Sequence, residues 1–96
     1  MKRVAKDDEH FVRVELPAAL RAIYVRASTD SALARKLVFE RLAYVGPDAT
    51  KKSSHADVLK ALAFCFKVIN TNSHDDPARA RKILRELEAD GVTRHH

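Results

Sequence analysis

The segment His10-Phe-Val-Arg-Val-Glu-Leu-Pro17 alternates apolar and polar side chains and stops at a proline. Alternation with a period of two is typical of a β-strand. One face of such a strand would carry Val12, Val14 and Leu16. The opposite face would carry Phe11, Arg13 and Glu15. No other segment has this pattern, and a lone strand leaves its backbone N–H and C=O groups unpaired. We therefore predict that it pairs with the same strand of a second copy, forming a homodimer.

The rest of the sequence has helical spacing, and it predicts helices over residues 18–27, 30–45, 55–69 and 77–90. Polar capping residues mark where three of them begin, at Asp30, at Ser54 with Asp57, and at Asp76 before Pro77. Helix ends are indicated by Gly46-Pro47 and by Gly91. The polar run 28–31 favours a turn, but the pattern leaves open whether residues 18–45 form two helices or one kinked helix.

Apolar side chains surround most of the predicted 55–69 helix, so we expect a central or interface helix. In the last helix the residues expected to face inward are Ala80, Ile83, Leu84 and Leu87. Four aromatic residues are expected in the core: Phe39, Tyr44, Phe64 and Phe66. Phe11 is the exception, since the outer face of a strand would expose it to a partner. Cys65 lies among apolar neighbours and is expected to be a buried, unreactive thiol.

Composition limits the classes of protein to consider. The 96 residues suit one compact domain, with a flexible arm (1–9), a strand-helix-helix module (10–46) and a C-terminal helical hairpin (53–91). The fold class is thus mainly α, with one short N-terminal strand followed by four helices. Two glycines, scattered histidines and no nucleophile motif argue against an enzyme, a cofactor or a metal site. A single cysteine and no long apolar run favour a cytoplasmic protein without a membrane span.

The order Val-x-Val-x-Leu-Pro, then a helix, then Thr-x-Ser-x-Leu resembles the ribbon-helix-helix family of DNA-binding regulators. Here the motif covers residues 11–45, from Val12 and Val14 through Leu16-Pro17 to Thr29, Ser31 and Leu33. The resemblance implies an intertwined homodimer that regulates transcription as a repressor, with a two-stranded ribbon in the major groove of DNA. It also implies that the outward strand residues Phe11, Arg13 and Glu15 contact bases. The start of the second helix, at Thr29, Asp30 and Ser31, would contact phosphate.

A net charge of +5 is compatible with this DNA-binding hypothesis. A guanidinium group such as that of Arg13 can donate two hydrogen bonds to guanine, at O6 and N7. The last predicted helix adds a possible secondary basic patch, formed by Arg79, Arg81, Lys82 and Arg85. Such a run is also common on a solvated helix face with no partner.

The alternative is a helical protein–protein interaction module, for example an adaptor or a phage- or plasmid-type inhibitor. Such a protein would act by adding its strand to a partner's sheet. It could also act by docking the 55–69 helix, within the C-terminal hairpin, on a partner or on a second copy. Glu15 and Asp30 favour this alternative, whereas Arg13 and Ser31 favour DNA.

Overall fold

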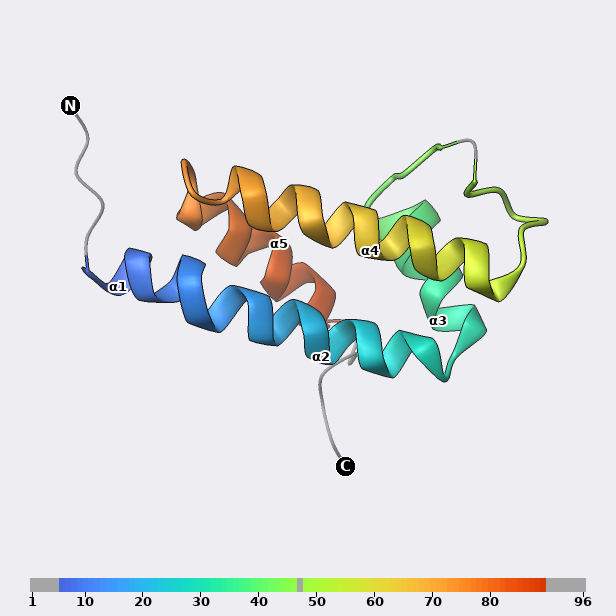
Figure 1. The fold of residues 1–96 in the computed structure, drawn as a ribbon, viewed down its shortest axis with the longest axis horizontal. Helices are drawn as coiled ribbons and strands as arrows, with labels where there is room; N and C mark the ends of the chain where they lie inside the picture. Colours follow the sequence, from blue (N-terminus) through green and yellow to red (C-terminus); the bar gives the residue numbers. More distant parts are fainter. Residues whose placement is uncertain (1–5, 47, 90–96) are drawn as a thin grey trace.

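The computed structural model describes residues 6–46 and 48–89, and this part of the chain is helical and contains no strand (Figure 1). The elements are α1 (Lys6–His10), η1 (Phe11–Glu15), α2 (Leu16–Ser28), α3 (Ser31–Lys36), η2 (Leu37–Arg41), α4 (His55–Asn72) and α5 (Pro77–Ala89). Here η1 and η2 are π-helical segments continuous with their neighbours. The prediction of a mainly helical protein is confirmed.

The predicted strand at His10–Pro17 is wrong, because α1, η1 and α2 form one continuous helical rod over residues 6–28. The paired ribbon that the family resemblance implied therefore has no counterpart in the described residues, and there is no strand to add to a partner's sheet. The predicted arm is also partly wrong, since residues 6–9 begin this rod. Its first five residues lie outside the described part of the chain.

Helical spacing explains why the rod forms. Apart from Phe11, its buried apolar residues recur at intervals of three or four: Val12, Leu16, Leu20, Ile23 and Ala27. Val12 and Leu16 fit a strand and a helix equally well, so Val14 distinguishes the two patterns. Val14 is 54% exposed, because a side chain two residues away from Val12 or Leu16 lies about 200° around the helix axis, on the opposite side of the rod. A stripe that extends to Ala27 buries more apolar surface than an alternation limited to three positions.

The η1 segment accommodates a proline inside this rod. Pro17 has no N–H, and in a regular α-helix its ring would clash with the carbonyl group four residues earlier. In η1 the closing hydrogen bond spans five residues, from the Leu16 N–H to the Phe11 carbonyl oxygen. We infer that this wider turn relieves the clash, so that Pro17 lies in the first turn of α2, where proline is tolerated.

Residues 18–45 form two helices, because the backbone breaks at Asp30. This residue is extended, and its carboxylate accepts a hydrogen bond of 3.0 Å from the Leu33 N–H at the start of α3.

The second helix ends earlier than predicted, at Arg41. Ala43 adopts a left-handed φ of 49°, a conformation common just after a helix end, and the Tyr44 N–H donates to the Val38 carbonyl at 2.8 Å. Val45, the last residue of the predicted helix, is 93% exposed.

The predicted starts of α4 and α5 are confirmed. Ser54 Oγ accepts from the Asp57 N–H at 3.2 Å, and the Asp76 carboxylate accepts from the Arg79 N–H at 3.0 Å. Helix α4 continues past the predicted end to Asn72. Pro47 and Gly91, which were expected to follow helix ends, lie outside the described residues.

The helices pack around one core. Figure 1 shows α2 and α4 running antiparallel side by side, with α5 crossing behind them and α3 at one end. The largest fully buried side chains are Leu16, Ile23, Leu37, Leu62, Leu87, Val38 and Val58. Arg35 holds the end of the long loop before α4 by donating to the carbonyls of Lys51, at 2.8 Å, and Ser53. Helix α4 contributes to both of the apolar surfaces described below.

Candidate functional site

Phe11, predicted to contact DNA bases, is instead in the core. Its side chain is 4% exposed, and the Arg81 guanidinium of α5 lies over its ring at 4.4 Å from the centroid. Arg81 also donates to Asp8 at 2.5 Å, which joins α5 to α1. A cation over an aromatic face and a partly buried ion pair both stabilise this contact. The prediction that Phe11 faces outward is therefore wrong, because η1 turns it toward α5.

The other two residues of the predicted base-reading set do face solvent. Arg13 forms an exposed ion pair with Glu9 one turn earlier, with 3.7 Å between nitrogen and oxygen. Glu15 lies 3.6 Å from His10 Nε2. Such exposed contacts contribute little to stability. The structure thus separates Phe11 from Arg13 and Glu15, which the strand hypothesis had placed on one face.

The predicted phosphate-contact residues form the turn between α2 and α3. Thr29 Oγ1 donates to the Arg26 carbonyl at 3.0 Å, and Asp30 caps α3. Ser31 is exposed in the first turn of α3. The Asp30 carboxylate already caps the N-terminus of α3, and its negative charge would repel a phosphate group there.

The predicted secondary basic patch on α5 is divided in the structure. Arg81 is directed toward α1, where it bonds Asp8, so it lies apart from the solvent-facing cations. Arg79, Lys82 and Arg85 are exposed on α5. We call these three residues the cationic face of α5, and the exposed Glu86, four residues after Lys82, lies on the same side of the helix.

The exposed side of α4 carries an apolar surface that the sequence analysis did not assign. Phe64 is 53% exposed, so the prediction that it lies in the core is wrong, and Val68 on the next turn is 39% exposed. They border a hollow of about 190 Å³ that is lined by Leu42, Tyr44, Phe64, Cys65, Val68 and Ile69. We call these six residues the Phe64 surface. None of them carries a charge at neutral pH.

The segment after η2 holds one wall of the Phe64 surface in place. The Tyr44 ring lies 5.7 Å from the Phe64 ring, centroid to centroid, at a tilted angle of 58°. Gly46 permits this position, since a Cβ atom there would come within 2.2 Å of the Tyr44 hydroxyl oxygen. The left-handed Ala43 turns the chain back toward α4. These backbone features place an aromatic wall beside an exposed aromatic residue.

Cys65 forms the floor of the Phe64 surface. Its thiol is buried, and this loss of solvent raises the pKa from 9.0 to about 11. A thiol with a raised pKa is a poor nucleophile at neutral pH. The prediction that Cys65 is a buried apolar residue is confirmed.

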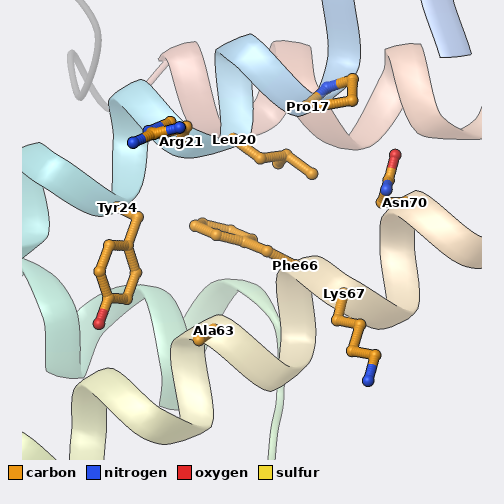
Figure 2. A pocket seen from close by; sticks show the side chains of 8 residues that line it. All are labelled: Pro17, Leu20, Arg21, Tyr24, Ala63, Phe66, Lys67 and Asn70. Atoms are coloured by element: carbon orange, nitrogen blue, oxygen red, sulfur yellow. The ribbon is translucent and has the colours of Figure 1, made fainter. Parts of the chain in front are cut away.

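A second apolar hollow, which we call the α2–α4 groove, lies on the other side of α4 (Figure 2). It has a volume of about 370 Å³ and is lined by Pro17, Leu20, Arg21, Tyr24, Ala63, Phe66, Lys67 and Asn70. Figure 2 shows Leu20 and Phe66 at its centre, with Arg21 on the α2 side and Lys67 on the α4 side. Asn70 Oδ1 is buried and accepts no hydrogen bond from the described residues. A buried unpaired acceptor costs stability, which is typical of a binding site more than of a core.

A helical projection of the sequence contains the signal for the Phe64 surface. The buried stripe of α4 consists of Val58, Ala61, Leu62, Cys65 and Phe66. Phe64 and Val68 are four residues apart and lie off that stripe, so they form a separate apolar pair on the helix. The α2–α4 groove has no comparable signal, because its two walls are far apart in the sequence.

The described residues include no group of three or more His, Cys, Asp or Glu side chains that could hold a metal ion. Among the same residues, no helix has the length and apolar content needed to cross a membrane. Comparison with protein-family models, curated proteins and solved structures found no match.

Proposed function

We propose that this protein is a non-enzymatic helical interaction module that works as a homodimer, in which the Phe64 surface contacts a second copy. The supporting observation is the half-exposed Phe64 beside Val68, above a hollow of apolar side chains. Exposed apolar patches of this kind are typical of contact sites between proteins. The homodimer predicted from the strand is thus retained as a proposal, with helices in place of the ribbon.

The charge distribution favours a second copy as the occupant of the Phe64 surface. In a two-fold symmetric contact, the same patch of both subunits comes together. The whole chain has a net charge of +5, so two copies repel each other, and a contact free of charged side chains avoids adding to that repulsion. The six residues of the Phe64 surface meet this condition. In the α2–α4 groove, by contrast, the same arrangement would bring Arg21 and Lys67 of both copies together.

The test is the mass in solution, measured by sedimentation or light scattering over a range of concentrations. The wild type is expected to approach twice its chain mass of 10.8 kDa as concentration rises. Phe64→Lys should weaken the dimer by at least about 100-fold, because two phenylalanine side chains lose their burial in a symmetric contact. The exposed position allows this change without disturbing the core.

Val25→Lys is the matched control for Phe64→Lys. Val25 is 58% exposed and lies on α2, outside the Phe64 surface, so its replacement should leave the dimer unchanged. A wild type that is monomeric at millimolar concentration would contradict the proposal. Equal weakening by both substitutions would place the contact elsewhere.

The second candidate function is DNA binding through the cationic face of α5, in the regulation of transcription. The observation that favours it is the exposure of Arg79, Lys82 and Arg85 on one helix of a chain with a net charge of +5. In a gel-shift assay, duplex DNA should then be retarded at low salt, with affinity that falls steeply as salt rises. Replacing Lys82 and Arg85 with glutamate should abolish the shift. Absence of binding by the wild type at low salt would remove this candidate.

A further inference from the structure

We propose that the α2–α4 groove binds an acidic amphipathic helix of a partner protein. This binding site is separate from the self-contact proposed for the Phe64 surface. The centre of the groove is apolar: Leu20 is 4% exposed and Phe66 is 6% exposed, and Figure 2 shows both side chains between the two helices. Ala63 and Pro17 extend this apolar lining toward solvent. Leu20 and Phe66 form the buried floor, so the apolar surface that a partner would cover belongs to Ala63, Pro17 and Tyr24, and covering it favours association.

The dimensions of the groove favour a helix as the occupant. The α2 wall extends from Pro17 to Tyr24, and the α4 wall extends from Ala63 to Asn70. Each wall therefore covers two helical turns, or about 10 Å. The apolar residues of an amphipathic helix at positions i, i+3 or i+4, and i+7 cover the same length. One such stripe can fill the groove along both walls.

The charges around the groove determine the kind of helix. Arg21 borders the groove on α2 and Lys67 borders it on α4, and no carboxylate is among the described residues that line it. A helix with glutamate or aspartate beside its apolar stripe would place those carboxylates near both cations. Complementary charges increase the rate of association and exclude partners of the wrong sign. A basic helix would be repelled at both walls.

A fluorescein-labelled amphipathic peptide of about 14 residues provides a direct test, with leucines at i, i+3, i+4 and i+7 and glutamates beside them. A matched peptide carries lysine in place of every glutamate. Fluorescence anisotropy with the full-length protein should show binding of the acidic peptide that weakens as salt rises. The lysine peptide should bind at least about tenfold more weakly.

Two variants test whether the peptide lies in the groove. Arg21→Glu combined with Lys67→Glu should weaken binding of the acidic peptide by about tenfold or more, because attraction becomes repulsion at both walls. Ala63→Phe should have a similar effect, since Ala63 lines the groove and a ring at this position would take up part of its volume. Lys82→Glu is the charge-matched control on α5, and it should leave binding unchanged. Circular dichroism of each variant would show that the helices are retained.

The same peptide and variant experiments give different results if the groove has another occupant. Equal binding of the acidic and lysine peptides, or an effect of Lys82→Glu as large as that of the Arg21 and Lys67 changes, would overturn the proposal. A change in the mass of the protein caused by Ala63→Phe would assign the groove to contact between copies. Phe64→Lys should leave peptide binding intact, so a failure of the dimer proposal is distinguishable from a failure of this one.

Discussion

Replacing Leu16 with alanine is expected to lower the free energy of unfolding by about 3 kcal/mol, whereas Val14→Ala should change it by less than about 0.5 kcal/mol. The reason is their position on the helical rod. Leu16 is fully buried, at 0% exposure, and Val14 is 54% exposed. For a domain whose total stability is about 5–10 kcal/mol, the first change removes a large share.

Urea denaturation followed by circular dichroism at one fixed protein concentration measures both values. A fixed concentration is needed because self-association adds to the apparent stability. The comparison also tests the helix against the strand, because an alternating strand places Val14 and Leu16 on the same face. Equal losses from the two substitutions would contradict the helical rod and support the alternating pattern.

Phe11→Ala is expected to have the largest effect, a loss of about 3–5 kcal/mol. Its ring is 4% exposed and is covered by the Arg81 guanidinium at 4.4 Å from the ring centroid. Removing the ring leaves a cavity between η1 and α5 and removes the aromatic surface beneath this cation. Loss of stability is therefore expected whether or not the protein binds DNA. Denaturant unfolding of the purified variant measures it.

A double-mutant cycle with Arg81→Met separates the cation–aromatic contact from the cavity. We expect Phe11 and Arg81 to be coupled by about 1 kcal/mol, since the contact is partly shielded from water. Arg79→Met is the control on the same helix, with no expected coupling to Phe11. A Phe11→Ala variant as stable as the wild type would contradict the burial of Phe11 and support an exposed position in which it contacts a partner.

The sequence allowed the helix starts to be predicted because capping is a local interaction. Asp30, Ser54 and Asp76 each accept a hydrogen bond from an N–H three residues later, so the relevant partners lie within one turn. The predicted inward residues of α5 are buried or partly buried for a similar reason, since their spacing of three and four is a property of the segment itself. These features require no knowledge of distant residues.

Residues 10–17 could not be assigned correctly from their alternation alone. Val12 and Leu16 satisfy both periods, and Pro17 is an accepted sign of a strand end or a helix start. The decisive information lies further along the chain, where Leu20, Ile23 and Ala27 continue the helical stripe. A π-helical turn before the proline then allows the rod to continue. Local alternation over three apolar positions was thus weaker evidence than the longer stripe.

Phe11 and Phe64 show what only the tertiary structure decided. The sequence analysis placed Phe11 outside and Phe64 inside, and the packing reverses both positions. Phe11 is buried because α5 lies over it, and Phe64 is exposed because α4 directs a different stripe toward the core. The sequence by itself determined a helical chain and the starts of α3, α4 and α5, through contacts within a turn. The α2–α4 groove depends on how residues distant in sequence pack, which local periodicity does not encode.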